Sequence, residues 1–267
     1  MRPKRPGRWS LKTINYYWRL FATAFCFFVF GVGGILIALI VAPIIIISFR
    51  NQNTRHIKGK LFIHYSFRMF IELMRLAGVL SYTVEGIEKF KEPGQLFLAN
   101  HPSLIDVVFM IAFIPRTDCV VKGKLSKNPF TYGPVNAAGY IMNAEPEAVL
   151  QSSIESISSG NSLIIFPEGT RTTPGEGMKF KRGAANVALR GEFDITPVVI
   201  GCTPTTLTKS DKWYHIPPKK LHFTMKVKDK ISIESFLQEK NANIAARSLT
   251  KSLEEYFSQE IKNLCLN

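Results

Sequence analysis

The chain has 267 residues, 46% of them hydrophobic, and a formal net charge of +14. This length suffices for one sizeable core with a small appendage, but hardly for two full domains. Eleven of the 34 basic residues precede the first acidic residue, Glu72, and the rest of the chain carries nearly equal numbers of basic and acidic residues. A nucleic-acid-binding domain usually carries a basic stripe on its folded body, so we expect no nucleic-acid partner.

The first predicted element is an apolar segment at positions 20–49, which holds no charged residue. A spanning helix needs about 20 apolar residues, whereas the core of a secretory signal has only about 7–15. The aromatic residues at 16–18 resemble the belt found at a membrane interface. Basic segments at 1–19 and 50–60 flank the apolar run, and such charges attract anionic lipids. The sequence therefore predicts a helical segment embedded in a bilayer that contains anionic lipids.

The topology of this segment has two interpretations. Six basic residues precede it and five follow by Arg68, so the positive-inside bias favours neither orientation. The segment could dip into the bilayer and return, bending at Gly31–Gly34 or near Pro43. A single tilted helix is the alternative, because a lipid-exposed turn would leave backbone groups unpaired. In a single helix, the glycine run would serve helix packing.

Four scattered cysteines indicate buried, reduced thiols, because no C-x-x-C pair is present. A disulfide framework and a zinc site are therefore not expected. We expect a body that faces the reducing cytoplasm, at the inner or cytoplasmic membrane. The cysteines are Cys26, Cys119, Cys202 and Cys265.

Beyond the basic linker at 50–60, residues 61–267 are predicted to form one α/β domain. Strand-like and helix-like stretches alternate there, which indicates a mostly parallel sheet. Several strands lack polar alternation, as strands buried on both faces do. The expected strands are Ser81–Glu85, Gln95–Ala99, Cys119–Lys122, Gly139–Met142, Ser162–Phe166, Ile195–Gly201 and Leu221–Val227. The expected helices are Leu61–Ala77, Ser103–Phe113, Lys124–Asn136, Glu147–Ser159, Lys181–Arg190 and Ile244–Leu264.

The stretch NHPSLID, Asn100 to Asp106, follows the strand LFLA and allows two interpretations. Ser103 and Asp106 have the spacing of a helix capping box. Alternatively, His101 lies off the helix, because Pro102 biases it away from helical geometry, and Asp106 holds one of its ring nitrogens. A histidine held by a carboxylate is the base-and-orienter arrangement of acyl-transfer enzymes.

The stretch FPEGTR, Phe166 to Arg171, ends a second buried strand and brings a carboxylate, a glycine, a hydroxyl and a guanidinium together. Arginine beside exposed backbone N–H groups suits phosphate recognition; an ordinary turn with a surface arginine is the alternative. Lys181 and Arg182 then precede a predicted helix. Cations at a helix N-terminus indicate an anion site, or are simply solvated.

In this order, NHPSLID, FPEGTR, FKRGAA and ITPVVI resemble the glycerolipid acyltransferase family typified by lysophosphatidic acid acyltransferase. The resemblance covers about Leu61 to Val227, and its first and third blocks, N-H-x-S-x-x-D and F-P-E-G-T-R, match at every defined position. It implies a glycerol-3-phosphate acyltransferase-like α/β body beside the membrane segment, and a membrane-bound enzyme of phospholipid biosynthesis.

The resemblance also implies residue roles. His101 would be the general base that deprotonates the acceptor hydroxyl, and Asp106 would support it. Asn100, Ser103, Glu168, Gly169, Thr170 and Arg171 would position the acceptor, with Arg171 on its phosphate. Lys181 and Arg182 would meet phosphates of the donor, acyl-CoA or acyl-carrier protein. Neither an acyl-enzyme, a metal nor a cofactor is expected.

One position departs from the family pattern. The family's second block runs from Gly-x-Ile to an Arg that helps hold the acceptor phosphate, but Glu145 stands at that place after Gly139 and Ile141. A carboxylate there should repel a phosphate monoester, so another lysolipid-like acceptor is expected. The alternatives are lysophosphatidic acid held by Arg171 and its neighbours, a lysolipid with an amino acid or sugar in place of phosphate, or an inactive membrane-binding homologue.

Overall fold

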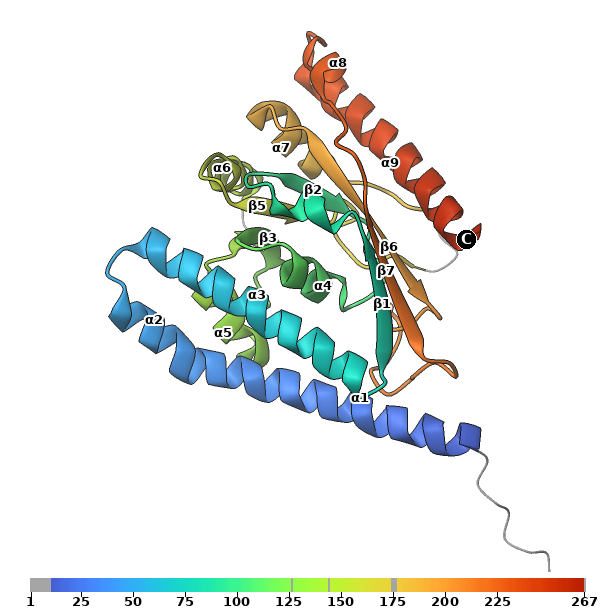
Figure 1. Cartoon of the computed structure of the whole chain (residues 1–267). Coiled ribbons are helices and arrows are strands. Elements are labelled where there is room, and N and C mark those ends of the chain that lie inside the picture. The colour runs from blue at the N-terminus through green and yellow to red at the C-terminus, as the bar shows by residue number, and fades with distance from the viewer. Residues whose placement is uncertain (1–10, 126, 144, 174–176, 267) are drawn as a thin grey trace, which may run out of the picture.

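The centre of the molecule is a seven-stranded sheet in the order β1-β7-β6-β2-β5-β3-β4. The computed structural model describes residues 11–266, apart from 126, 144 and 174–176 (Figure 1). The strands are β1 (Leu80–Glu85), β2 (Leu96–Ala99), β3 (Thr117–Lys122), β4 (Ile141–Asn143), β5 (Ser162–Ile165), β6 (Ile195–Thr203) and β7 (Leu221–Val227). Every neighbouring pair is parallel except β6 and β7. The α/β class with a mostly parallel sheet is thus confirmed.

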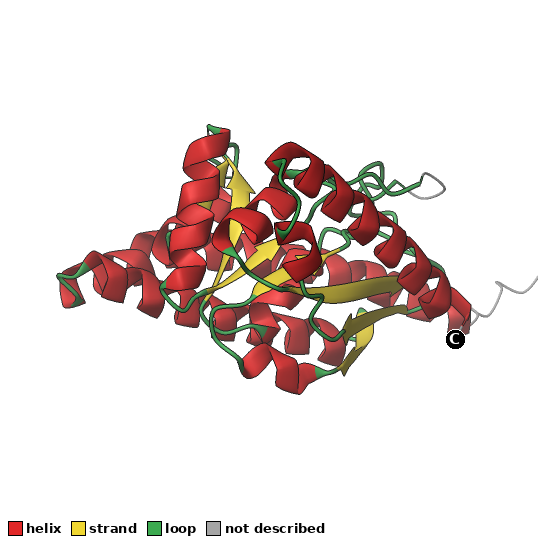
Figure 2. Ribbon diagram, turned by 90° about the horizontal axis from the view of Figure 1, so that it is seen from above, coloured by secondary structure: helices red, strands yellow, loops and turns green. Residues whose placement is uncertain are grey.

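Helices cover both faces of the sheet, as the view from above in Figure 2 shows. One face packs on α3, α4 and α5, the other on α6, α7 and α9. In β2, Phe97 and Ala99 point to the first layer and Leu96 and Leu98 to the second, all fully buried. The helices are α3 (Gln52–Leu76), α4 (Asp106–Phe113), α5 (Pro129–Ala138), α6 (Pro146–Ser158), α7 (Gly183–Gly191), α8 (Glu234–Leu237) and α9 (Ala242–Leu266), with a 3-10 turn at Ile87–Lys91.

The N-terminal apolar segment is one continuous helix. It consists of α1 (Leu11–Leu36), a π-helical turn (Ile37–Val41) and α2 (Ala42–Ser48). The π turn lies just before Pro43, whose ring would clash with the carbonyl four residues earlier in a regular α-helix. Of the two interpretations, the structure shows the single helix: the chain does not turn back at Gly31–Gly34 or near Pro43, and it reverses only after Phe49.

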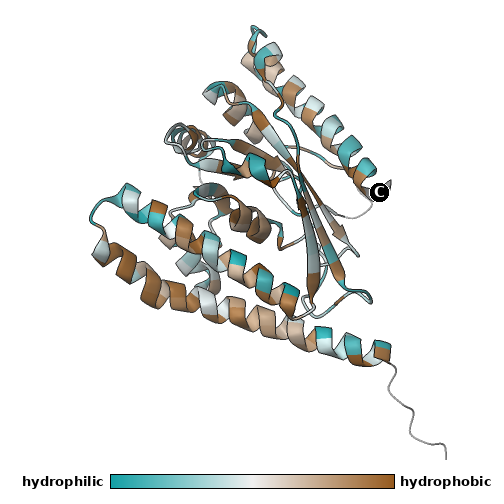
Figure 3. Ribbon diagram, viewed as in Figure 1, coloured by the Kyte–Doolittle hydropathy of each residue, from teal (hydrophilic) through white to brown (hydrophobic). Residues whose placement is uncertain are grey.

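This helix is long and apolar enough to cross a membrane, measuring about 57 Å at 1.5 Å per residue. Figure 3 shows hydrophobic colouring along α2 and the second half of α1. Large apolar side chains are exposed along its length: Phe21, Phe25, Phe28, Val32, Leu36, Leu39, Ile40, Ile44 and Ile47.

The opposite side of α1 packs closely on α5 through glycines. A Cβ atom on Gly34 would lie 1.8 Å from the carbonyl oxygen of Phe130, and one on Gly133 would lie 2.4 Å from the backbone nitrogen of Ala38. Gly34 therefore serves helix packing, which was one of the two expected roles of the glycine run. The apolar helix is part of the folded body.

Residues 50–60, expected as a linker, instead begin α3. Asn51 caps this helix, because its side-chain oxygen accepts the backbone N–H of Thr54 at 3.0 Å. Gly59 packs against Ala137, and the buried Lys60 pairs with Asp118 of β3 at 2.6 Å. The basic stretch is thus tied into the tertiary structure.

Candidate active site

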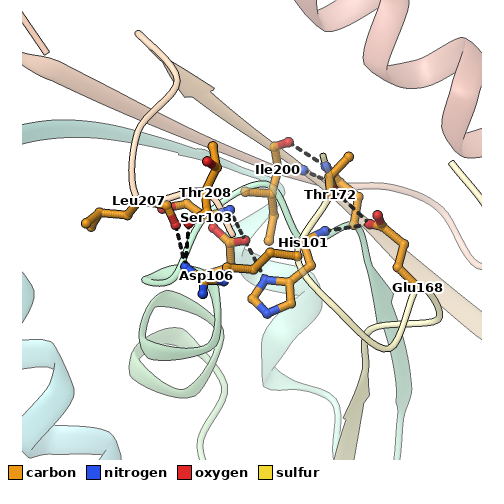
Figure 4. Close-up of polar contacts among 10 residues, drawn as sticks. His101, Ser103, Asp106, Glu168, Thr172, Ile200, Leu207 and Thr208 are labelled. Carbon is orange, nitrogen blue, oxygen red and sulfur yellow. Dashed lines mark hydrogen bonds and ion pairs between the residues drawn. The ribbon is translucent and has the colours of Figure 1, made fainter. Parts of the chain in front are cut away.

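Two of the sequence motifs meet at one edge of the sheet, because β2 and β5 are parallel neighbours with Leu98 opposite Ile165. Hydrogen bonds join the residues that follow these strands (Figure 4). The backbone N–H of His101 donates to Glu168 Oε1 at 2.9 Å, and the N–H of Thr172 donates to the His101 carbonyl at 2.8 Å. The Thr172 hydroxyl also donates to Glu168 Oε1, at 3.0 Å. NHPSLID and FPEGTR therefore form one site.

His101 and Asp106 lie in direct contact, with 2.8 Å between Nδ1 and Oδ2. The same carboxylate oxygen accepts the backbone N–H of Ser103 at 2.7 Å. The pairing interpretation of NHPSLID is therefore confirmed, whereas Ser103 does not cap the helix, because its hydroxyl has no hydrogen-bond partner among the described residues and Ile105 is the N-cap of α4. Helix α4 begins at Asp106 rather than at Ser103, because residues 101–105 form the turn that carries the histidine off the helix.

The imidazole of His101 is fixed on one side and open on another. Its ring stacks on Phe166 with 4.3 Å between centroids. The side chain is 19% exposed, whereas Asp106 is fully buried. A carboxylate acceptor at Nδ1 assigns the proton to that nitrogen, which leaves Nε2 able to accept a proton.

Burial raises the pKa of the Asp106 carboxyl to about 6, although hydrogen bonds from His101 and Ser103 oppose this shift. At neutral pH the group is therefore largely ionised. It can stabilise positive charge on the neighbouring imidazole.

Asn100 and Glu168 are used inside the protein. Asn100 bridges β2 to β6, because its amide donates to the Ile200 carbonyl at 2.8 Å and accepts the Ile200 N–H at 2.7 Å. Glu168 is buried and holds His101 and Thr172. The structure thus places both as supports of the turns, and Thr172, which sequence reasoning missed, belongs with them.

Arg171 contacts the loop that follows β6. Its Nη1 donates to the carbonyl oxygens of Leu207 and Thr208, both at 2.8 Å. Within the described residues, Nε and Nη2 make no hydrogen bond, so part of the guanidinium fork remains available.

Comparisons with known proteins identify an acyltransferase. Residues 81–201 match a family model described as Acyltransferase. The chain is 28% identical over 174 residues to the 1-acyl-sn-glycerol-3-phosphate acyltransferase of Helicobacter pylori, covering 62% of this chain and 70% of that protein. The protein of the same name from Saccharomyces cerevisiae is 32% identical over 151 residues, 53% of this chain and 50% of that one. The chain is therefore similar to the 1-acyl-sn-glycerol-3-phosphate acyltransferases, with an Acyltransferase domain matched at residues 81–201.

The fold of this acyltransferase also matches a solved structure. The crystal structure of the 1-acyl-sn-glycerophosphate (LPA) acyltransferase PlsC from Thermotoga maritima superposes with a TM-score of 0.63. The match covers 93% of this chain and 98% of that one, at 19% identity.

Lys181 packs against the FPEGTR turn, whereas Arg182 is exposed. The backbone N–H of Lys181 donates to the Pro167 carbonyl at 2.8 Å. Gly169 has a φ of +67°, and a Cβ atom there would lie 2.9 Å from Lys181 Nζ. Lys181 therefore passes over the glycine, while Arg182 is exposed at the start of α7 and Thr170 is exposed in the turn.

Glu145 follows β4, the outermost strand on the β5 side of β2. Three strand spacings separate β4 from β2, about 14 Å at ~4.8 Å each. Glu145 is exposed, and its side chain makes no capping bond to α6. Lys122, which sequence reasoning missed, is exposed at the end of β3, next to β5. Lys122 thus follows a strand that is closer to β2 in the sheet than β4, which precedes Glu145.

Among the described residues, no group of three or more His, Cys, Asp or Glu side chains is arranged to hold a metal ion. The metal-free, cofactor-free mechanism stays a prediction.

Proposed function

We propose that this acyltransferase moves a fatty acyl chain from a thioester donor, acyl-CoA or acyl-carrier protein, to a free hydroxyl of a lysophospholipid. One observation carries the proposal: a partly exposed histidine is oriented by a fully buried carboxylate at the carboxyl edge of the sheet. The acceptor class follows from the names of the relatives, which acylate 1-acyl-sn-glycerol-3-phosphate.

His101 Nε2 takes the proton of the acceptor hydroxyl while the oxygen attacks the thioester carbonyl. Asp106 stabilises the imidazolium that forms. The carbon–sulfur bond then breaks, and the departing thiolate takes the proton back from Nε2. The products are an ester and a thiol, with no acyl-enzyme intermediate. General-base assistance of this kind contributes about 10²–10⁴-fold.

The acceptor phosphate fits the cations beside the base. Arg171 retains two nitrogens for a phosphate, Lys181 lies over Gly169, and Lys122 ends the strand next to β5. These groups favour lysophosphatidic acid as acceptor. Glu145 favours a second candidate, a lysolipid without a phosphate monoester, because its exposed carboxylate stands at the same edge of the sheet.

The location of the reaction follows from the apolar helix. Acceptor and product both carry acyl chains that partition into a bilayer, and the exposed apolar side chains of α1 and α2 would keep the enzyme there. Reduced thiols and a cytoplasmic acyl donor favour the inner or cytoplasmic membrane, with the active site facing the cytoplasm and anionic lipids near the basic segments.

The test uses the full chain in vesicles with radiolabelled acyl donor and a panel of lysolipids. We expect transfer to lysophosphatidic acid by the natural protein and a loss of at least about 10²-fold in His101→Ala. His222→Ala, a change at a half-buried histidine of β7 whose ring contacts Ser81 and Thr83 of β1, is the matched control and should stay active. Unchanged transfer in His101→Ala refutes the mechanism, and no transfer to any acceptor by the natural protein favours the inactive homologue.

A further inference from the structure

The connection between β6 and β7 contains an exposed stretch rich in cations and aromatic rings. Residues 209–220, KSDKWYHIPPKK, are here named the basic aromatic loop. Trp213 and Tyr214 are 46% and 41% exposed. The acidic side chain of this loop, Asp211, accepts hydrogen bonds from the N–H and hydroxyl of Thr208, at 3.0 and 2.9 Å. The loop thus presents its four lysines, Lys209, Lys212, Lys219 and Lys220, to solvent.

One end of the loop is fixed to the apolar N-terminal helix. The guanidinium of Arg19, which is only 5% exposed, donates to three successive carbonyl oxygens of the loop. Its Nη1 lies 2.9 Å from the carbonyls of Pro217 and Lys219, and its Nη2 lies 2.7 Å from that of Pro218. The Nε of Arg19 donates to Asn15 Oδ1 within α1 at 2.9 Å, so the guanidinium joins the helix to the loop and positions the loop against α1 (Figure 1).

The loop also runs along the helix toward the bilayer segment. Trp213 contacts Phe27 with 5.8 Å between ring centroids. Phe27 lies eight residues beyond Arg19, about 12 Å along the helix axis. Trp213 therefore reaches past the start of the charge-free segment, while Lys219 is held at its boundary through the contact with Arg19. Aromatic rings beside cations at such a boundary are typical of a membrane interface.

The other end of the connection is fixed to the candidate active site. Arg171 holds the carbonyls of Leu207 and Thr208, and Leu207 also accepts the N–H of Leu104 at 3.1 Å. Leu104 lies between His101 and Asp106 in the chain. The basic aromatic loop is thus held between the apolar helix and both active-site motifs.

We propose that the basic aromatic loop binds the headgroups of anionic lipids, with Trp213 and Tyr214 in the interface and the four lysines on lipid phosphates. The consequence of this binding rests on the proposed function, because the bound loop would hold the membrane surface beside the acceptor site. Headgroup binding itself is measured without acyl transfer.

The first experiment measures binding of the full chain to phosphatidylcholine vesicles with and without phosphatidylglycerol. The test variant carries Lys209→Gln, Lys212→Gln, Lys219→Gln and Lys220→Gln. The matched control removes the same charge from exposed lysines elsewhere, with Lys91→Gln, Lys240→Gln, Lys251→Gln and Lys262→Gln. At about fivefold per lysine, we expect the test variant to lose up to several-hundredfold of its affinity for anionic vesicles.

The control should bind anionic vesicles nearly as the natural protein does. An equal loss in both variants overturns the proposal, because only net charge would then matter. Normal vesicle binding by the test variant, with a raised KM for acyl-CoA, also overturns it, because the lysines would then serve the donor.

The second experiment follows Trp213 directly. With Trp9→Phe and Trp18→Phe it is the one tryptophan left in the chain. We expect its emission to shift to shorter wavelength on anionic vesicles, and an unchanged spectrum would refute its place in the interface. His101→Ala should show the same shift, so a failure of the acyl-transfer proposal leaves this result intact.

Discussion

Replacement of Asp106 by Asn separates the chemical role of this residue from its role in the fold. Asp106 Oδ2 accepts hydrogen bonds from both His101 and Ser103, whereas Oδ1 has no partner among the described residues. An Asn side chain can therefore place its oxygen at the Oδ2 position and its NH2 group at the Oδ1 position. The imidazole orientation and the turn are kept, and only the negative charge is lost.

The expected loss of activity follows from the distance between the two charges. The carboxylate and the imidazolium that forms on His101 have charge centres about 4 Å apart, and at an effective dielectric constant near 20 their attraction is worth about 4 kcal/mol. Removal of that attraction slows the step that charges the imidazole by about 10³-fold.

The expected effect on stability has the opposite sign. Burial raises the pKa of Asp106 to about 6 from its ordinary 3.8. The folded state thus binds the proton more tightly than the unfolded chain, so the ionised carboxylate at pH 7 opposes folding by about 3 kcal/mol. The unpaired NH2 of Asn costs about 1–3 kcal/mol in its place. The free energy of unfolding should stay unchanged or rise by up to about 2 kcal/mol.

Thiol release from acyl-CoA measures the rate, and urea unfolding in detergent measures the stability. Asp229→Asn, at a 97% exposed carboxylate, is the control and should alter neither quantity. Full activity in Asp106→Asn would mean that no charge develops on His101. A fall of several kcal/mol in the free energy of unfolding would mean that Asp106 acts mainly by holding the turn at Ser103.

Three further outcomes can be measured. Acyl transfer should fall as the pH drops through about 6, because the Asp106 carboxyl becomes neutral there. The same acidification should raise the free energy of unfolding, because the buried carboxylate then no longer opposes folding. A transfer rate that is independent of pH between 5 and 8 would contradict the role of the Asp106 charge. Glu145→Arg should raise turnover of phosphate monoester acceptors over uncharged ones, with Glu147→Arg as the control, and an unchanged acceptor ratio excludes that position from acceptor choice. Gly34→Ala should lower the midpoint of thermal unfolding strongly, because the new Cβ would lie 1.8 Å from the Phe130 carbonyl oxygen. Gly33→Ala is the control and should leave the midpoint unchanged, because a Cβ there would meet no atom within 4 Å. Equal midpoints in the two variants would refute the close packing of α1 on α5.

Much of the body could be predicted from local patterns in the sequence. The strands were found because runs such as LFLA are buried on both faces and therefore carry no polar alternation. The pairing of His101 with Asp106 followed from Pro102 and from the spacing of a capping box. These features depend on neighbours within a few residues.

Features set by distant contacts could not be predicted. The positive stretch 50–60 has the composition of a linker, but Lys60 finds Asp118 and Gly59 finds Ala137, and these contacts extend α3 to Gln52. Arg171 was expected to be free for phosphate, yet it binds carbonyls 36 and 37 residues further along. The insertion of β7 between β1 and β6 likewise depends on long-range pairing.

If the apolar helix lies in a bilayer as proposed, the glycine contact between α1 and α5 sets the height of the reaction above the lipid. An enzyme on a flexible tether could sample many depths and still find its substrate. Here the apolar helix packs directly on α5 of the folded body, so under the proposed function the hydroxyl to be esterified would rise to the imidazole rather than the reverse. Lipids whose reactive hydroxyl sits too deep or too far out would be poor substrates, even with the correct headgroup.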